Sequence, residues 1–566
     1  MSVAAGIDRG LTSYGDAGFS RYLRRAFLAA AGYDRQDLSR PVVGIGHTIS
    51  DYVPCHRQMP EVVAAVERGV LQAGGIPFCF PLAALGEPLL SPTSMLYRNL
   101  AAMQAEELVR AQPLDSVVLV GGCDKTVPAQ MLAAVSAGRP ALLEVTGPMI
   151  TGRWRGQPMG ACTDCRRTWS EHRAGRLSGD DVQEVEQALA PTAGTCMVMG
   201  TASTMACLAE SLGMMLPGGA TPPAPTGARL RHAVQTGRRA VELALAKPAE
   251  TTVAGASLRN SLVVLAAIGG STNALVHLVA VARRAGLDLT LRDAGPIMEG
   301  VPLLVDCKPT GARYMEDFDQ AGGLPVLLKA LEPLLDTTAP TARGDTLAEL
   351  LTHVDPPAPW QDMIGTLDAP KGPAGTLVVL AGSLAPDGAV IKAGAASAAL
   401  LRHTGAAVVF DSPDEAARVL DDASLDLTAE HVLVLRNAGP VGAAMPEAGS
   451  LPLPKRLLEA GVRDMVRISD ARMSGTAEGT VVLHCAPEAA VGGPLALVED
   501  GDLIRLDVAG GTVDLLVDDR QLEQRRAAWS PPALAERGWL RLHQQHAVGA
   551  DLGADLDFLV PPAMRR

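Results

Sequence analysis

The segment Val117–Pro128 reads VVLVGGCDKTVP, an apolar run that ends in two glycines and continues with a thiol, a carboxylate and an amine. The pattern predicts a buried strand, a turn and then a helix. In open α/β sheets, ligands bind at the carboxyl ends of strands, and glycine lets the backbone approach a ligand that a Cβ would exclude. Cysteine suits a soft metal, and aspartate suits a hard cation. The segment therefore predicts a site, although a core cysteine beside an exposed salt bridge would give the same pattern.

The arrangement of a turn, a cysteine and a helix occurs twice more. Cys55 follows the strand-like run Pro41–Gly46 and precedes a predicted helix over Met59–Ala73. Cys196 follows a glycine turn and precedes another helical run, although no clear strand comes before it. Helix N-termini favour thiolates. We therefore expect Cys55, Cys123 and Cys196 to converge on one point.

Three further motifs in the first half carry polar groups. Glu87 lies in a tight turn. Gly269–Asn273 lies at a predicted helix start, where it can bind an anion through backbone N–H groups or simply cap the helix. Cys162 and Cys165 form a C-x-x-C motif, which suits half of a zinc site or a redox pair. Because no second pair with matching spacing follows, we interpret this motif as unrelated to a metal site, although it can border a substrate.

The character of the sequence changes after residues 335–375, whose many prolines and glycines predict a linker. Six short runs of β-forming residues follow, separated by glycine and aspartate turns. They are Thr376–Leu380, Ala406–Phe410, His431–Arg436, Val481–His484, Leu503–Val508 and Thr512–Val517. We predict an α/β fold class, with a large α/β domain over residues 1–370 and a smaller, β-rich, barrel-like domain over residues 371–566.

The composition limits the function further. The 566 residues are too many for one ordinary core, and 48% hydrophobic with 20% charged residues indicate a folded protein. A net charge of -13 argues against nucleic acid or an anionic membrane as the partner. Nine scattered cysteines do not form a disulfide framework. The first residues lack the apolar core of a signal peptide, and the longest apolar run, Leu262–Ala282, is interrupted by Gly269–Asn273, so we expect a cytoplasmic protein.

Two polar turns in the second half complete the set of candidate residues. Asn437–Pro440 leads to Glu447, and Ser469–Gly479 combines hydroxyl groups, an arginine and two acids. Taken by itself, the second turn fits an exposed loop equally well.

These motifs together resemble the dihydroxy-acid and sugar-acid dehydratase family. The resemblance extends from about residue 10 to about residue 530 and keeps the order of the family's motifs. The motifs that carry it are Pro54–Cys55, Gly121–Thr126, Gly194–Cys196, Gly200–Met205, Gly269–Ala274 and Ser469–Thr476.

Within the family, Leu85–Glu87, Asp470–Thr476 and His484–Pro494 look more like the aldonic-acid branch than the branch of branched-chain amino-acid synthesis. The dihydroxy-acid dehydratases proper usually carry a Gly-Arg-Phe-Ser-Gly-Gly type turn where this chain has Ala471–Gly475. A sugar acid is therefore the expected substrate. His56–Pro60 and the segment of the C-x-x-C motif depart from the usual pattern of sugar-acid members, and both could line the substrate pocket.

The resemblance implies two metal centres. Family members bind an iron–sulfur cluster through three cysteines, which here would be Cys55, Cys123 and Cys196. We expect a [2Fe-2S] cluster, with [4Fe-4S] as the alternative; three thiolates leave one iron open as a Lewis acid for the C3 hydroxyl. Members also bind Mg²⁺ through acidic residues and a carbamylated lysine, since an ammonium has no lone pair for a cation. Here those ligands would be Glu87, Asp124, Glu447 and Lys125.

The resemblance also implies the remaining chemistry. Ser474 stands in the position of the family's base and would remove the C2 proton as an alkoxide, with Thr476 assisting by a hydrogen bond. Loss of water would give an enol that becomes the 2-oxo-3-deoxy acid. The site would lie between the two domains. The expected partners are a small hydroxy-acid substrate and further copies of the chain, as a homodimer or homotetramer.

Two alternatives stay open. The first keeps the family and makes 2,3-dihydroxyisovalerate the substrate. The second is an iron–sulfur sensor without turnover, suggested by the three cysteines and the C-x-x-C motif. Loss of turnover in Ser474→Ala with an intact cluster would favour a dehydratase over the sensor.

Overall fold

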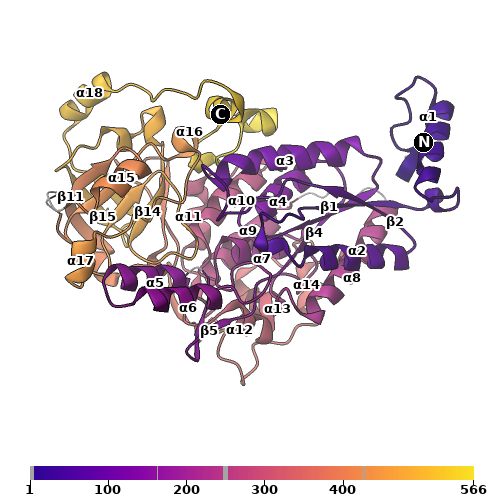
Figure 1. Cartoon of the computed structure of the whole chain (residues 1–566), viewed down its shortest axis with the longest axis horizontal. Helices are drawn as coiled ribbons and strands as arrows, with labels where there is room; N and C mark the ends of the chain where they lie inside the picture. The colour runs from indigo at the N-terminus through magenta and orange to yellow at the C-terminus, as the bar shows by residue number, and fades with distance from the viewer. Residues whose placement is uncertain (1–5, 162, 247–252, 423–424, 426, 566) are drawn as a thin grey trace.

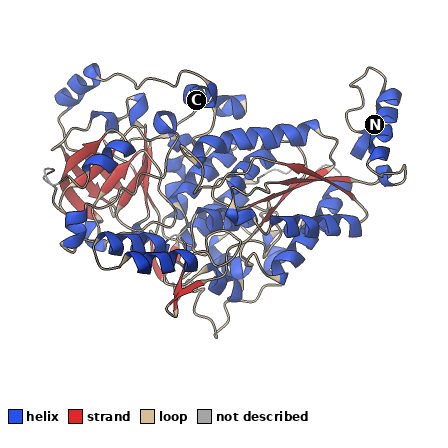
Figure 2. Ribbon diagram, viewed as in Figure 1, coloured by secondary structure: helices blue, strands red, loops and turns tan. Residues whose placement is uncertain are grey.

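The computed structural model describes residues 6–161, 163–246, 253–422, 425 and 427–565, so Cys162 of the C-x-x-C motif lies outside the described residues. The chain forms an N-terminal α/β region and a C-terminal region rich in strands (Figure 1). Figure 2 shows most of the strands gathered in these two places, with helices around and between them.

The N-terminal region is built on a parallel sheet with the strand order β2-β1-β3-β4. Its strands are β1 (Val42–His47), β2 (Ile76–Pro81), β3 (Ser116–Gly121) and β4 (Ala141–Val145). Every residue of β3 and β4 is buried, as expected of parallel strands that are covered on both faces. The predicted strand before the Gly121-Gly122 turn is confirmed.

Alternate side chains of β3 enter two different cores. Val118 and Val120 pack with residues of two helices on one face, and Val117 and Leu119 pack with residues of two helices on the other. The first pair of helices is α2 (Met59–Gln72) and α8 (Gly227–Leu245), and the second is α3 (Ser94–Ala111) and α4 (Thr126–Ser136). α4 begins directly after Lys125, so the candidate ligands lie at a helix start.

Three helices fill the centre of the N-terminal region: α7 (Thr201–Ser211), α9 (Gly255–Ala267) and α10 (Thr272–Arg284). All residues of α10 are buried, although it ends in two arginines. The Gly269-Gly270 pair separates α9 from α10, so the long apolar run is divided as predicted. Among the described residues, no helix is long and apolar enough to cross a membrane.

The C-terminal region is an eight-stranded mixed sheet with the order β16-β15-β11-β12-β13-β14-β10-β9. Its strands are β9 (Val378–Leu380), β10 (Gly388–Ile391), β11 (Arg402–Phe410), β12 (Val432–Leu435), β13 (Arg467–Ser469), β14 (Val481–Ala486), β15 (Leu503–Asp507) and β16 (Thr512–Leu515). A bridge from Ala381, directly after β9, to Thr512 in β16 nearly closes the sheet into a barrel. The predicted fold class is confirmed, and each of the six predicted β runs contains a strand.

The linker predicted over residues 335–375 is wrong as a description of that stretch. It holds the short helix α14 (Leu347–Leu351) and the strand β8 (Gly372–Ala374), which pairs with β7 (Pro302–Leu303). Leu347 and Ile364 belong to the N-terminal core. Prolines make this segment irregular but do not keep it away from the core. The division of the chain at residue 370 stays a prediction.

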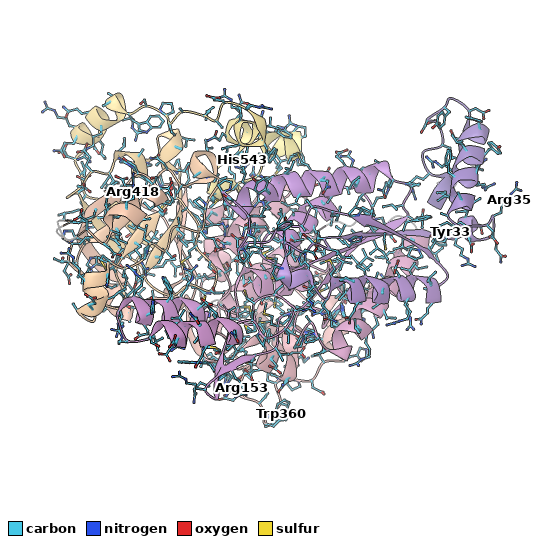
Figure 3. All side chains as sticks on the ribbon, in the orientation of Figure 1. Tyr33, Arg35, Arg153, Trp360, Arg418 and His543 are labelled. Carbon is cyan, nitrogen blue, oxygen red and sulfur yellow. The ribbon has the colours of Figure 1, made fainter. Side chains whose placement is uncertain are left out.

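The last residues of the chain return to the N-terminal region. Asp555 accepts hydrogen bonds from Arg284 at 2.7 and 2.9 Å, and Arg98 donates to the Ala554 carbonyl at 2.8 Å. His543 (Figure 3) lies in α19 (Gly538–His546) and hydrogen-bonds the Pro440 carbonyl at 3.0 Å. This C-terminal segment therefore contacts both regions and fixes their relative position.

The remaining helices lie around these cores. They are α5 (Thr163–Arg173), α6 (Gly179–Ala188), α11 (Leu291–Met298), α12 (Met315–Gln320), α13 (Gly323–Leu331), α15 (Pro413–Val419), α16 (Pro440–Ala443), α17 (Lys455–Glu459) and α18 (Asp519–Ala528).

Residues 6–40, here named the N-terminal arm, contact the rest of the chain through Gly6, Arg9 and Tyr33, and their helix projects from one end of the molecule (Figure 1). The arm carries α1 (Ala17–Ala30), of which Ser20 alone is buried. Tyr22 and Phe27 are 67% and 72% exposed. The helix therefore presents these two aromatic side chains to solvent.

A candidate active site between the two regions

Three carboxylates meet at the junction of the two regions. One oxygen each of Glu87, Asp124 and Glu447 lie within 4.8 Å of one another. Glu87 comes from the loop before α3, Asp124 from the turn after β3, and Glu447 from the loop after α16. Two of the acids thus belong to the N-terminal region and one to the C-terminal region, so the cluster exists only when the two regions are packed together.

Two buried cations face these acids. Arg472 donates to Glu447 at 2.6 Å and to Glu87 at 2.5 Å, and Lys125 Nζ lies 3.5 Å from a Glu87 oxygen. Neither cation is exposed to solvent by more than a trace. Arg472 was seen in the sequence as part of a polar turn but was given no role there, because nothing in the local pattern indicates that its side chain reaches Glu87.

The carboxylates differ in their electrostatic surroundings. Against the opposing effect of burial, Lys125 and Arg472 lower the pKa of Glu87 to about 2. Burial, together with the charges of Glu87 and Glu447, raises the pKa of Asp124 to about 7. Three acids thus share two cations, which leaves the cluster one positive charge short and able to accept a further cation.

Two buried histidines adjoin the cluster. No described group hydrogen-bonds either ring nitrogen of His484 or the Nε2 atom of His277. Burial, with the charges of Arg472 and Lys125, lowers the pKa of His484 to about 3, and burial with Arg98, Lys125 and Arg472 lowers the pKa of His277. Both rings are therefore neutral, and each carries an N–H that lacks an acceptor or a nitrogen that lacks a donor. Sequence reasoning gave neither histidine a role.

Two of the three predicted cysteine ligands are in direct contact. The hydrogen bond to the Cys55 thiol, and then burial, raise the pKa of Cys123 well above its ordinary value. Cys123 has a φ of 67°, a left-handed conformation that is uncommon for a residue other than glycine. A Cβ on the preceding Gly122 would collide with the Thr146 hydroxyl. The turn is therefore built to hold the Cys123 side chain at one place.

The loop that carries Cys196 lies close to Cys123. A small enclosed cavity is lined by Gly122, Cys123, Thr195 and Ser203, and the Ser203 hydroxyl donates to the Cys196 carbonyl at 3.1 Å. Within the described residues, the three thiols are not all within 4.8 Å of one another, as the three carboxylates are. The structure thus brings the three cysteine-bearing turns together, with Cys55 and Cys123 in direct contact.

The serine turn lies against the starts of two N-terminal helices. The hydroxyl oxygens of Ser474 and Thr476 are 2.7 Å apart. Asn273 donates to the Met473 carbonyl at 3.0 Å and to Thr201 at 3.1 Å. The predicted motif Gly269–Asn273 therefore holds this turn, in addition to capping α10.

The C-x-x-C segment also reaches the serine turn. Thr163, which lies between the two cysteines, donates to the Thr476 carbonyl at 3.0 Å. Asp164 forms an ion pair with Lys308 at 3.0 Å and accepts a hydrogen bond from the Tyr314 hydroxyl at 2.9 Å. Cys165 lies on the edge of an open groove between α5 and α6. The segment borders the site, as expected, through residues other than the described cysteine.

Comparison with known proteins adds what the geometry alone does not give. Residues 40–350 match the model of the dihydroxy-acid/6-phosphogluconate dehydratase N-terminal domain, and residues 362–554 match the model of the C-terminal domain. The two matches account for most of the chain.

Curated proteins are similar over nearly the whole length. The 6-deoxy-6-sulfo-D-gluconate dehydratase of Pseudomonas putida is 46% identical over 545 residues, covering 95% of this chain and 94% of that protein. The L-arabinonate dehydratase of Rhizobium leguminosarum bv. trifolii is 44% identical over 555 residues, covering 96% and 95%. The dihydroxy-acid dehydratase of Methanoregula boonei is 36% identical over 546 residues, covering 95% and 98%.

Proposed function

The chain belongs to the dihydroxy-acid/6-phosphogluconate dehydratase family and is a dehydratase, and from that premise we propose that it converts a sugar acid into the 2-oxo-3-deoxy acid. The observation that carries the proposal is the meeting of three carboxylates from both regions, on the same interface as the Ser474–Thr476 hydroxyl pair. A 2,3-dihydroxy acid needs both parts, a cationic centre for its carboxylate and a base for its C2 proton.

The relatives favour a sugar acid over a branched dihydroxy acid. The two named for sugar acids share 46% and 44% of aligned residues with this chain, whereas the dihydroxy-acid dehydratase shares 36%. Dehydration of 2,3-dihydroxyisovalerate is the second candidate, because that relative covers the chain equally well.

The acidic cluster fits a hard cation, which we propose to be Mg²⁺. Glu87, Asp124 and Glu447 supply oxygen ligands, and Lys125 would join them as a carbamate. The unpartnered nitrogens of His277 and His484 support this modification. The charge of Lys125 lowers the pKa of both rings, so both lie near its side chain. Carbamate oxygens there would give the ring nitrogens the acceptors that they lack.

The three cysteine turns fit an iron–sulfur cluster, which we propose to be [2Fe-2S]. Cys55 and Cys123 contact one another, and the loop of Cys196 lines the same cavity as Cys123. Cysteine thiolates held in turns are the donor set of such clusters. When bound, the cluster supplies a Lewis acid for the C3 hydroxyl, and Mg²⁺ neutralises the substrate carboxylate.

The chain's own residues then handle the proton. Ser474 Oγ takes the proton from C2 of the substrate, and Thr476 Oγ1, 2.7 Å away, donates a hydrogen bond to it. Asn273 and Thr163 hold the two ends of the turn through backbone carbonyls. Loss of the C2 proton and the C3 hydroxide leaves an enol, which takes a proton at C3 and becomes the 2-oxo acid.

We also propose that the chain associates with copies of itself through the N-terminal arm. Exposed aromatic residues on a projecting helix favour burial against a partner. The helix also carries Arg21, Arg24 and Arg25, whose positive charges would be attracted to a partner copy with a net charge of -13. Light scattering should give a dimer or tetramer for the wild type and a smaller species for Phe27→Glu; a monomeric wild type would contradict the proposal.

The experiment that tests the function is 2-oxo acid formation by anaerobically purified, Mg²⁺-supplied enzyme. The panel contains pentonates, hexonates, 6-deoxy-6-sulfogluconate and 2,3-dihydroxyisovalerate. Turnover dominated by sugar acids is the expected result. Turnover of the branched acid alone would establish the second candidate, and no turnover with an intact cluster would favour a sensor.

A serine variant tests the mechanism separately. Ser474→Ala should lower kcat by at least about 10³-fold while keeping the visible absorbance of the cluster, because the base is lost and the cysteines are not. The matched control is Ser412→Ala, which removes only the N-cap of α15 and should leave kcat unchanged. Full turnover in Ser474→Ala would exclude this serine as the base.

A further inference from the structure

Lys392 is a fully buried lysine that the proposed mechanism has not used. It follows β10 directly and is among the largest side chains with no exposed surface. Its Nζ donates to the Gly475 carbonyl at 3.2 Å. Among the described residues, no carboxylate lies within ion-pair distance of it. A buried ammonium without an ion pair destabilises a fold, so its presence at this position calls for a functional reason.

The carbonyl that Lys392 holds belongs to the serine turn. Gly475 lies between Ser474 and Thr476, whose hydroxyl oxygens are 2.7 Å apart. From the other side, a Cβ on Gly475 would come within 2.5 Å of the Ser271 hydroxyl and 2.9 Å of the Thr201 nitrogen. The serine turn therefore lies between the helix starts of the N-terminal region and the ammonium of Lys392. A shift of the turn would break one of these contacts.

The other charged groups around Lys392 compensate its charge weakly. Burial lowers the pKa of Lys392 to about 7, against the effects of Cys307 and Glu478. Burial raises the pKa of Cys307 to about 12, so that thiol is neutral. Burial also raises the pKa of Glu478, whose charge is shared with Lys308 and Arg167. The positive charge of Lys392 therefore acts mainly on the serine turn.

Resting on the proposed role of Ser474 as the base, we propose that Lys392 is a positioning residue for the dehydration. Its ammonium fixes the Gly475 carbonyl, and thereby the Ser474 hydroxyl, and its charge favours the deprotonated serine. Lys392 acts in its protonated form and transfers no proton in the reaction.

The test compares Lys392→Met and Lys392→Arg with the wild type in kcat and KM across the neutral and alkaline pH range. Lys392→Met should lower kcat by about 10²-fold or more with KM changed less than about threefold, because the lost interaction acts on the transition state. In the wild type, kcat should fall as pH rises through about 7, where the ammonium loses its proton. Lys392→Arg should recover part of the lost kcat and lack this alkaline fall, because a guanidinium stays charged.

Thermal unfolding separates positioning from packing. Lys392→Met should raise Tm, because it removes a buried charge without an ion pair. The gain should be fully present below pH 7 and shrink as pH rises toward the ordinary lysine pKa of 10.5, where the charge no longer opposes folding. The control is Lys455→Met, an exposed lysine that should change neither kcat nor Tm.

The inference is overturned if Lys392→Met keeps full kcat, or if kcat and Tm fall together with an unchanged pH profile, which is the result of a packing role. A wild type that dehydrates no hydroxy acid would contradict the proposed function instead. That outcome removes the basis of the inference, whereas full kcat in Lys392→Met beside an active wild type contradicts the inference alone.

Discussion

Two buried ionic clusters in this chain look alike in composition and differ in what they can do. In the first, Glu144 accepts hydrogen bonds from Arg229 at 3.2 Å, His232 at 2.8 Å and Thr236 at 2.7 Å. We name it the Glu144 cluster; it lies within the N-terminal region and joins β4 to α8. The second is the acidic cluster of Glu87, Asp124 and Glu447 with Arg472 and Lys125.

The difference lies in how completely each cluster is satisfied. In the Glu144 cluster, one carboxylate meets two cationic partners, and His232 and Arg229 lower the pKa of Glu144 despite its burial. In the acidic cluster, three carboxylates share two cations, and the pKa of Asp124 rises to about 7. A buried carboxylate that cations compensate fully joins elements of a fold, whereas a surplus of carboxylates between two regions is prepared for a ligand.

The largest expected effect comes from the acidic cluster. Asp124→Asn should lower kcat by about 10³-fold or more, because a proposed Mg²⁺ ligand is lost, while Tm stays equal or rises. The matched control is Asp115→Asn, a buried acid that accepts from the backbone N–H groups of Gly6 and Val42. The control should lose stability and keep kcat. Equal loss of kcat in both variants would show that Asp124 has no special role in the chemistry.

The Glu144 cluster should respond in the opposite way. Glu144→Gln leaves the buried Arg229 without its anion and should lower the free energy of unfolding by about 3–5 kcal/mol. The kcat of the fraction that stays folded should not change. Denaturant titration and kinetics on the same preparation measure both quantities, and a stable variant with lost turnover would mean that Glu144 serves the chemistry.

A smaller effect should follow from removing a histidine that would hold the proposed carbamate of Lys125. His484→Phe removes an unpartnered ring beside Lys125 and should lower the occupancy of a Lys125 carbamate by about tenfold, by analogy with groups that support metal ligands. The ¹³C carbamate signal after growth and purification in labelled bicarbonate reports occupancy without reference to turnover. An unchanged signal would show that the histidine does not hold the modification.

The smallest effect is the pH dependence of the Glu144 cluster. Glu144 raises the pKa of His232 above 6.5 against burial, so this part of the stability is fully present below pH 6.5 and is lost as pH rises through the raised pKa. The pKa of Glu144 lies below 4.5, so its part is present above pH 4.5 and is lost as pH falls through the lowered pKa. The stability difference between wild type and Glu144→Gln should therefore be greatest between pH 4.5 and 6.5. A flat difference would show that His232 does not titrate with folding.

Much of the architecture could be predicted because it follows from local patterns. The apolar run before Gly121-Gly122 is a buried strand, and the six β runs of the second half are strands, since hydrophobic alternation and turn residues act over a few positions. The stretch 335–375 was predicted wrongly, because proline and glycine content reports backbone irregularity but not whether a segment such as Leu347–Leu351 finds a core to pack on.

By itself, the sequence determined the two kinds of region, the family resemblance and the residues proposed as ligands and base, because each of these is written in short motifs. Only the tertiary structure decided that Arg472 reaches Glu87 across 385 positions, that His277 and His484 face Lys125, and that Lys392 supports the serine turn. The protonation and role of a buried charged group depend on the neighbours that packing brings close to it. Contacts between distant parts of a chain produce no periodic or local pattern in the sequence.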